Sequence, residues 1–447
     1  MGLLQSRAGY ALAAAAALAV VLGAGWLVPE QPLLAMVLGV TVLALGVALF
    51  DAALIPLLLL PGLYVTQRVA LGGTDLSVSD VALALAVAPA VVLGHRPLAE
   101  PVRQILWLVT IYQVASLFTV IANPYAANTI EWVHTWFLIG GALLVGWTIG
   151  RGGHGPAGLK LMLAAATVLA GWVVVVGLSR VARGDFAPIY LPYGMHKNFL
   201  GTVLAITALV AYVRPAWLGL GRRLAALLFG WLVLATGFTQ SRQAIVGLGV
   251  ALVVLVLRTR TDRRRSQLVL LAVVPAIAVV LTMVRDQIVS GNEFNSAFQR
   301  LTWFEDSLEI WRTNPVVGVG LRWWYTDRFG EGFQPPNAEL EVLTSAGVVG
   351  LLGFLALMIG SVLVLWRVEP AYGMLAVLAV LSRFVQGQLD IFWVAAQCSV
   401  PFVIAGICLG VQALHEDEGV SAADLEEGEA DRTGARAGRV VSTAVAS

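Results

Sequence analysis

Long, continuous apolar segments recur along this sequence, and they constrain its fold more than any other feature. Each is about 17–25 residues long, the length that a helix needs to cross a hydrocarbon core of about 30 Å. Examples are Ala11 to Leu27, Ile105 to Ile121, Leu161 to Leu178, Leu268 to Met283 and Val348 to Leu365. Because they lack the apolar–polar alternation of barrel strands, we expect membrane-spanning helices.

The composition agrees with a membrane protein. Only 12% of the residues are charged and 59% are hydrophobic, whereas a soluble domain carries about a quarter charged residues. We therefore predict an all-α polytopic membrane protein, a bundle of about 12–14 transmembrane helices. The least regular stretch is Leu33 to Tyr64, which Asp51, Pro56 and Pro61 interrupt. A net charge of +1 gives no reason to expect a nucleic-acid partner.

Basic residues fall at every second connection between the apolar segments. Positive loops are retained in the cytoplasm, so we place inside the connections His95 to Arg103, Arg151 to Lys160, Arg214 to Arg223, Arg258 to Arg265, and Arg367. The connections Ala122 to Thr135 and Val385 to Asp390 contain no Lys or Arg, and we place them outside. Both termini are then cytoplasmic.

The expected organisation is a polytopic membrane domain over residues 1–412, with an extracytoplasmic loop at 286–340 within it. Residues 413–447 form an acidic tail that is poor in large apolar groups, so we expect it to be disordered in the cytoplasm. Cys398 and Cys408 are ten residues apart and lie on different helical faces, which favours packing roles over a disulfide.

The loop from Arg285 to Asn337 is too long for an ordinary connection. Its apolar residues recur at spacings of three and four from Ser296 to Arg312, which predicts an amphipathic helix. Asn314-Pro315 should end that helix. Trp323, Trp324 and Tyr325 follow, and such an aromatic surface either stacks on sugar rings or belongs to the interfacial belt of a membrane protein.

Cations also occur in regions that the charge pattern places outside, namely Arg180 to Asn198, Gln240-Ser241-Arg242 and Arg285 to Asn337. Cations beside helix ends suit the diphosphate at the head of a lipid. The alternative is that these side chains extend to ordinary lipid headgroups.

One region resembles a known family. The run RLTWFEDSLEIWRTNPVVGVG from Arg300 to Gly320, followed by Pro335-Pro336-Asn337 and Gly347-Val-Val-Gly350, is similar to the signature region of the O-antigen ligase and polymerase (Wzy-like) family. Gly194 to Gly201 and Gln240-Ser241-Arg242 give weaker similarities. The resemblance covers most of residues 190–355.

The resemblance implies a GT-C-like glycosyltransferase of the bacterial cytoplasmic membrane that takes part in polysaccharide biosynthesis for the cell envelope. Its partners would be a polyprenyl-diphosphate-linked glycan donor, a lipid or glycan hydroxyl acceptor, and membrane lipids. No metal or other cofactor is expected, because guanidinium groups can stabilise a leaving diphosphate. Arg242 and Arg300 are the leading candidates for that role, and the further substrate-binding candidates are Lys197, Asn198, Arg322, Trp323, Trp324 and Asn337.

The sequence departs from the family pattern at Pro336, which occupies the position of the family's histidine. That histidine is thought to contact or activate the acceptor, and proline cannot do so. Either His196 supplies the base, or the nearby carboxylate of Glu339 does, or the chain is not catalytically competent. His196 is slightly favoured because imidazole titrates near neutral pH. Glu341 points away from Glu339 by about 200° on a helix, so the two would not act together.

Two other functions compete with glycan transfer. A transporter or flippase would need ionisable residues or broken helices at the bilayer midplane. The main candidates, Asp51 and Asp390, lie near predicted span ends, which weakens that hypothesis. A catalytically silent homologue that acts as a scaffold in envelope glycan export is the other alternative, and Pro336 is its only support.

Overall fold

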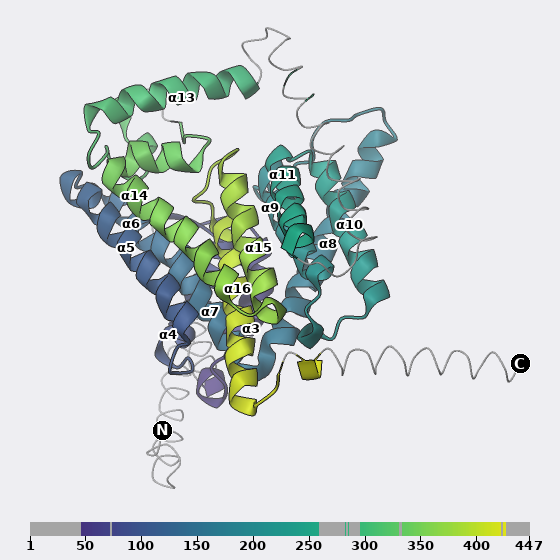
Figure 1. Ribbon diagram of the computed structural model, residues 1–447. Coiled ribbons are helices and arrows are strands. Elements are labelled where there is room, and N and C mark those ends of the chain that lie inside the picture. Colours follow the sequence, from purple (N-terminus) through teal and green to yellow (C-terminus); the bar gives the residue numbers. More distant parts are fainter. Residues whose placement is uncertain are drawn as a thin grey trace, which may run out of the picture.

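The computed structural model describes residues 46–71, 74–258, 282, 285, 296–329, 333–421 and 423–425. Within them the chain forms a bundle of helices that pack side by side, with one helix lying across an end of the bundle (Figure 1). The predicted all-α polytopic membrane fold is confirmed. Two of the predicted apolar segments, Ala11 to Leu27 and Leu268 to Met283, lie outside the described residues except for Thr282.

Six helical segments in the described ranges are long and apolar enough to cross a bilayer. They are α5 (Glu100–Ala122), the segment Ala126–Val181, α10 (Arg222–Thr239), α14 (Ala338–Arg367), α15 (Pro370–Gly387) and α16 (Ala395–Glu418). Shorter apolar helices are Leu54–Tyr64, α4 (Val78–Val92) and α9 (Lys197–Val213), and α11 covers Arg242–Arg258. The total of about 12–14 spans stays a prediction.

The segment Ala126–Val181 contains 56 residues, which at about 1.5 Å per residue is far too long for one crossing. It divides at Gly153, whose φ of 80° interrupts the helix. Before that break lie α6 (Ala126–Trp136), the π-helical turn η2 (Phe137–Gly141) and α7 (Ala142–Ile149). The break itself lies within η3 (Gly150–His154), and α8 (Gly155–Val181) follows. The segment therefore supplies two crossings.

The irregular stretch around Pro56 and Pro61 forms two short helical pieces, α3 (Leu54–Leu59) and the 3-10 helix η1 (Leu60–Tyr64). A small antiparallel hairpin follows, with β1 (Arg68–Leu71) paired to β2 (Thr74–Ser77). Sequence analysis does not predict this hairpin. Its last residue, Ser77, then caps α4 in a capping box with Asp80.

Close approach of backbones holds α7 against α16. A Cβ atom at Gly146 would lie 2.1 Å from the carbonyl oxygen of Val403, and one at Gly406 would lie 2.2 Å from that of Leu143. Small residues at such contacts allow helices to pack tightly in a membrane. Cys398 and Cys408, also on α16, are buried and free, as the sequence predicts.

Connections that the charge pattern places on the same side contact each other at the ends of the bundle. At one end, Trp147 Nε1 donates to the His95 carbonyl and Arg258 donates to that of Trp366. At the opposite end, which we call the α13 end, Tyr125 Oη donates to the Leu321 carbonyl. Helix α13 (Ser296–Thr313) lies there (Figure 1).

Helix α13 confirms the helix predicted for Ser296 to Arg312, and it ends directly before Asn314-Pro315. The apolar residues Leu301, Phe304 and Leu308 of the predicted face are exposed, and the buried positions are Ser307 and Ile310. At the other extreme of the chain, α16 continues to Glu418, beyond residue 412, where we expect the membrane domain to end. Hydrogen bonds of Gln412 to Glu416 and of His415 to Tyr372 support this extension. Residues 426–447 of the expected acidic tail lie outside the described residues.

Candidate functional site

The two halves of the family-like motif contact each other through their backbones. Helix α14 is broken at Gly347, where φ is 66° and ψ is −167°. The Val349 N–H donates to the Val316 carbonyl over 3.2 Å, and the Gly320 N–H donates to the Ser345 carbonyl over 2.9 Å. A Cβ atom at Gly347 would lie 2.2 Å from the Val316 oxygen, so the spacing of the motif reflects this close approach.

The start of α14 is fixed to the connection between α15 and α16. Asn337 caps the helix, with its Oδ1 accepting from the Leu340 N–H over 2.9 Å. Its Nδ2 donates to the Gln388 carbonyl over 3.1 Å. The Gln388 amide in turn donates to Glu339 Oε1 over 2.6 Å. Pro336 is buried next to this capped end.

Asp390, two residues after Gln388, joins α9 and α13 to the same connection. Its Oδ2 accepts from Asn198 Nδ2 over 2.9 Å, and its Oδ1 lies 4.0 Å from Arg300 Nη2. Arg300 also donates to the Leu389 carbonyl over 2.7 Å. Asp390 is 7% exposed, so its carboxylate orients side chains from two other elements inside the protein.

Three cations gather at this point, and we call Lys197, Arg242 and Arg300 the cation cluster. Lys197 lies within electrostatic range of Arg242, Arg300 and Asp390. Lys197 and Arg242 are the first residues of α9 and α11, whose N-termini carry partial positive charge. Three cations and two helix N-termini thus lie close together, with Lys197 and Arg300 beside the buried Asp390, which makes this region suited to an anionic ligand.

His196 is the N-cap of α9. Its Nδ1 accepts a hydrogen bond from the Asn198 N–H over 3.2 Å. A backbone N–H can only donate, so Nδ1 carries no proton and the neutral ring holds its proton on Nε2. Burial lowers the pKa of His196 below its usual range, against the opposing effect of Asp390. Burial therefore favours the neutral ring, and the one lone pair of that ring is already in use.

Glu339 and Glu341 have different surroundings, in line with their predicted separation. Within the described part of the chain, Glu339 Oε2 is buried without a hydrogen-bond partner. Both oxygens of Glu341 are occupied, by Gln334 Nε2 at 2.8 Å and by the Phe392 N–H at 3.3 Å. Of the two carboxylates, Glu339 is the one with an oxygen that has no hydrogen-bond partner among the described residues.

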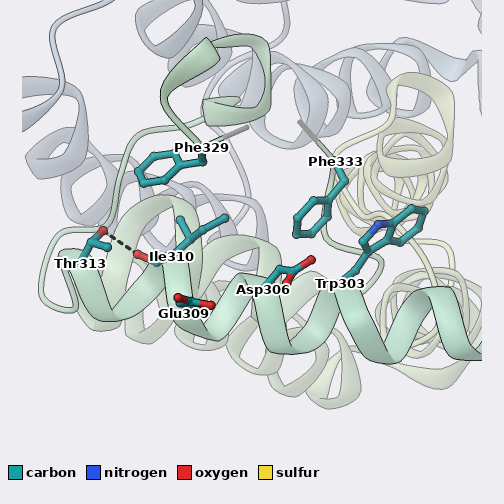
Figure 2. Close-up of a pocket in the computed structure, with 7 residues that line it drawn as sticks. All are labelled: Trp303, Asp306, Glu309, Ile310, Thr313, Phe329 and Phe333. Atoms are coloured by element: carbon teal, nitrogen blue, oxygen red, sulfur yellow. Dashed lines mark hydrogen bonds between the residues drawn. The ribbon is translucent and has the colours of Figure 1, made fainter. Parts of the chain in front are cut away.

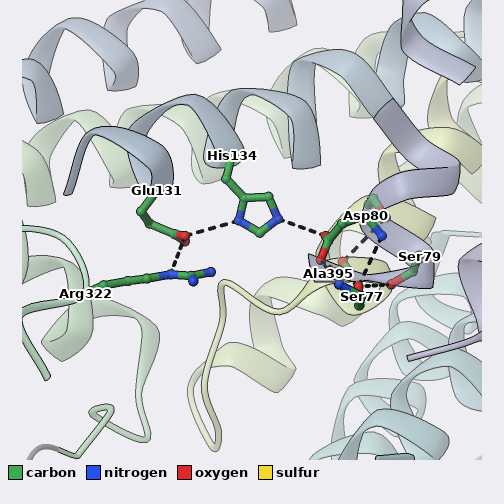
Figure 3. A network of polar contacts seen from close by, with 8 residues as sticks. Ser77, Ser79, Asp80, Glu131, His134, Arg322 and Ala395 are labelled. Atoms are coloured by element: carbon green, nitrogen blue, oxygen red, sulfur yellow. Dashed lines mark hydrogen bonds and ion pairs between the residues drawn. The ribbon is translucent and has the colours of Figure 1, made fainter. Parts of the chain in front are cut away.

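Arg322 belongs to a separate polar network, which Figure 3 shows. Its Nε lies 2.5 Å from Glu131 Oε2, which also contacts His134 Nδ1 at 3.2 Å. His134 Nε2 then reaches Asp80 Oδ1 at 2.9 Å. This chain of charges ties the loop after α13 to α6 and α4. The contacts of Arg322 among the described residues connect it to this network and not to the cation cluster.

The side chain of Trp323, a predicted substrate-binding residue, is not accessible. It is 1% exposed and packs edge-on against Phe329 and Phe333. A sugar cannot stack on a ring that other aromatic rings cover. Trp324 is half-buried, and Tyr325 is 60% exposed, so the accessible aromatic surface begins after Trp323.

The structure places the candidates Arg242, Arg300, Lys197 and Asn198 in one region, and the residues that join them are not among the candidates from the sequence. From the sequence, Asp390 is a candidate only for a transporter, and Gln388 is not a candidate for any function. Both lie almost 200 residues from Asn198 in the sequence, and no spacing links them. Their one signal is polarity in a connection that otherwise lacks Lys and Arg.

An apolar cavity of about 320 Å³ lies between the ends of α8 and α10 and the segment after α8. Gln240, at its edge, is two residues from Arg242 of the cation cluster. The cavity is lined by Gly177, Arg180, Val181, Asp185, Phe186, Ala187, Ile189, Leu234, Gly237, Phe238 and Gln240.

Residues 199–355 match the family model described as O-antigen ligase. The matched range begins in α9 and ends in α14, and it includes Arg242, Arg300, Asn337 and Glu339. The resemblance predicted from the sequence is confirmed. No curated protein matches the chain. The family match and the membrane-spanning helices indicate a multi-pass inner-membrane protein with O-antigen ligase-like glycan transfer as its general activity.

Proposed function

We propose, on the premise that residues 199–355 form an O-antigen ligase domain, that this chain transfers a glycan from a polyprenyl diphosphate to a hydroxyl group. The acceptor is a lipid or another glycan, and transfer takes place at the outer face of the bacterial cytoplasmic membrane. The observation that carries the proposal is the cation cluster, in which Lys197 lies within electrostatic range of Arg242, Arg300 and Asp390.

The cation cluster would bind the diphosphate of the donor. Transfer breaks the bond between the anomeric carbon of the glycan and the diphosphate oxygen, and it forms a bond from that carbon to the acceptor oxygen. The diphosphate leaves with additional negative charge, which nearby guanidinium and ammonium groups stabilise. Asp390 holds Arg300 and Asn198 in position for this contact. Because the cations provide this stabilisation, we expect transfer to persist in EDTA.

Glu339 is the best candidate to receive the proton of the acceptor hydroxyl. Its Oε1 is held by Gln388, and its Oε2 is buried with no partner among the described residues. A general base must have a free lone pair within reach of the proton that it takes. His196 uses its lone pair to cap α9, which favours a positioning role. Glu339 would thus replace the family histidine that is missing at Pro336.

The apolar cavity between α8 and α10 would hold the first part of the polyprenyl chain. Gln240, which lines this cavity, is two residues from Arg242 of the cation cluster. A donor bound in this way keeps its hydrocarbon in an apolar environment while its diphosphate meets the cations. Arg322, Asn337 and Trp324 would contact the glycan at the α13 end.

The proposal is tested in a deletion strain that expresses single variants of the full chain. Arg300→Ala and Arg242→Ala should each lower transfer about tenfold to a hundredfold, since a charge-assisted contact is worth about 1.5–3 kcal/mol. The lysine variants should recover part of the activity, because they restore charge without the planar fork. Arg312→Ala is the matched control, since Arg312 is an exposed arginine on the same helix.

Envelope glycans are compared by gel electrophoresis and mass spectrometry, together with the lipid-linked donor. We expect the donor to accumulate on the outer leaflet in the Arg300 and Arg242 alanine variants. Loss of capped product would identify a ligase, and shortened chains would identify a polymerase. Normal glycans in both alanine variants at normal expression would contradict the proposal. Donor trapped on the inner leaflet would instead favour a flippase.

A further inference from the structure

A second cavity, of about 590 Å³, lies along α13. Figure 2 shows α13 forming one wall and Phe329 and Phe333 forming the other. Its α13 residues are Trp303, Asp306, Glu309, Ile310 and Thr313. The proposed glycan transfer does not use this cavity, and its lining has a chemistry of its own.

The face of α13 that lines the cavity carries two carboxylates. Residues 303, 306, 310 and 313 follow one another at spacings of three and four, which aligns them on one helical face. A face built only for packing would be apolar, yet Asp306 and Glu309 lie there. In the ranges that the structure describes, neither carboxylate makes a hydrogen bond or an ion pair with a protein group. Both therefore remain able to accept hydrogen bonds from a ligand.

The aromatic rings beside these carboxylates are held in place. Trp303 and Phe333 are parallel within 5°, with their ring centroids 5.7 Å apart. The buried Trp323 packs edge-on against Phe333 at 5.4 Å and against Phe329 at 5.8 Å. Trp323 thus fixes the wall of the cavity from behind. Flat apolar rings thus lie next to carboxylates that can accept hydrogen bonds. This combination matches a sugar ring, which presents C–H groups on one side and hydroxyl donors at its edge.

We propose that this cavity binds a neutral or amino sugar of the glycan substrate and excludes sugars that carry a carboxylate. The inference rests on the proposed glycan transfer and adds the class of sugar. Helix α13 links the two regions, since Trp303 follows Arg300 by three residues, or about 4.5 Å along the helix. A uronic acid in the cavity would face Asp306 and Glu309, and the seven residues that line the cavity include no Lys or Arg, which disfavours its binding.

Saturation-transfer NMR on the full chain in lipid nanodiscs tests the inference without requiring transfer. The probes are maltotriose, which is neutral, chitotriose, which carries amide sugars, and trigalacturonic acid, which is anionic. Wild-type protein should saturate the ring protons of at least one of the first two probes and leave trigalacturonic acid unaffected. Binding of trigalacturonic acid as strong as that of the neutral probes would overturn the proposal.

Variants assign the binding to the cavity. Trp303→Ala should weaken saccharide binding roughly tenfold or more, and Trp303→Phe should retain much of it. Phe304→Ala is the matched control, because Phe304 is a partly exposed aromatic residue on α13 outside the cavity. The Asp306→Asn, Glu309→Gln double variant should bind trigalacturonic acid, whereas Glu305→Gln should not. Equal binding by wild type and Trp303→Ala would contradict the assignment.

A transfer assay on membranes then identifies which substrate contributes the sugar. Extracted lipid-linked donor and extracted acceptor are varied separately. Trp303→Ala should raise the KM of only one of them, and that one occupies the cavity. Unchanged KM values for both would overturn the inference and leave the proposed transfer intact. Saccharide binding that depends on Trp303, in a protein without transfer activity, would instead remove the proposed function and preserve the sugar site.

Discussion

His196 and Glu339 are the two candidates for the base that acts on the acceptor hydroxyl, since Pro336 stands where the family has a histidine. Their hydrogen bonds distinguish the two candidates. The N-cap bond of His196 uses the only lone pair of its neutral ring. Glu339 has one oxygen anchored by Gln388 and the other buried without a partner in the described chain. Sequence reasoning slightly favours His196 because it considers titration and not hydrogen bonding.

Glu339→Gln should therefore lower transfer by about 10²- to 10⁴-fold, the usual effect of losing a general base. The amide can still accept from Gln388 through its oxygen, so the start of α14 should remain folded. Steady-state transfer assays with purified protein measure the loss, and donor binding measured separately should change little. Glu339→Asp should retain part of the activity. Wild-type turnover in Glu339→Gln would remove this carboxylate from the mechanism.

His196→Asn separates capping from catalysis, because asparagine is an effective N-cap but cannot act as a base. If His196 only positions α9, the asparagine variant should keep most of the transfer activity at pH 7.5. His196→Ala should lose about 0.5–2 kcal/mol of stability with the cap. Loss of transfer in His196→Asn, with donor still bound, would return the base role to the imidazole.

The pH dependence of stability is a second way to compare wild type with His196→Asn. The pKa of His196 is lowered in the folded protein, so the unfolded state binds more protons below about pH 6.5. The contribution of the neutral His196 ring to the free energy of unfolding is fully present above that pH. It is lost as the pH falls toward the lowered pKa of the folded protein. Thermal unfolding between pH 7.5 and pH 5 should show this loss in wild type, and His196→Asn should reduce it.

At the level of secondary structure, predictability follows the length and periodicity of each element. The three-and-four spacing of apolar residues and the Asn314-Pro315 stop are sufficient to predict α13. The hairpin of β1 and β2 has four residues in each strand, which is too short to leave a clear alternation. The break at Gly347 depends on contact with Val316, and a long-range backbone contact leaves no periodic signal.

A substitution on α10 tests whether the cavity beside it binds the polyprenyl chain, and it leaves the cation cluster unchanged. Gly237 lines this cavity, and a Cβ atom there would meet no other atom within 4 Å. Gly237→Leu should fill part of the space and raise the KM for the lipid-linked donor several-fold, with kcat largely retained. Gly230→Leu is the matched control, because Gly230 is equally open on the same helix and lies outside the cavity. Equal kinetics in both variants would exclude the cavity as the polyprenyl site.

For the whole molecule, the remaining question is which end faces the cytoplasm. Basic residues occur at both ends of the bundle. At the α13 end, many of them are engaged by carboxylates, as Arg180 is by Asp185, Arg300 by Asp390 and Arg322 by Glu131. Orientation follows the Lys and Arg residues of short loops beside the spans, and the short basic connection Arg214 to Arg223 and the first residue of the next one, Arg258, belong to the opposite end. We therefore predict that the α13 end is outside.

Cysteine labelling in intact spheroplasts tests this orientation. Cys398 and Cys408 are buried, so the wild-type chain should react little with a membrane-impermeant maleimide. Tyr325→Cys introduces a thiol at the α13 end, at a position that is 60% exposed, and Glu369→Cys introduces one at an exposed position of the opposite end. The first should label in intact spheroplasts and the second only after lysis. The reverse pattern would put the cation cluster in the cytoplasm, where transfer to an acceptor on the outer leaflet could not occur.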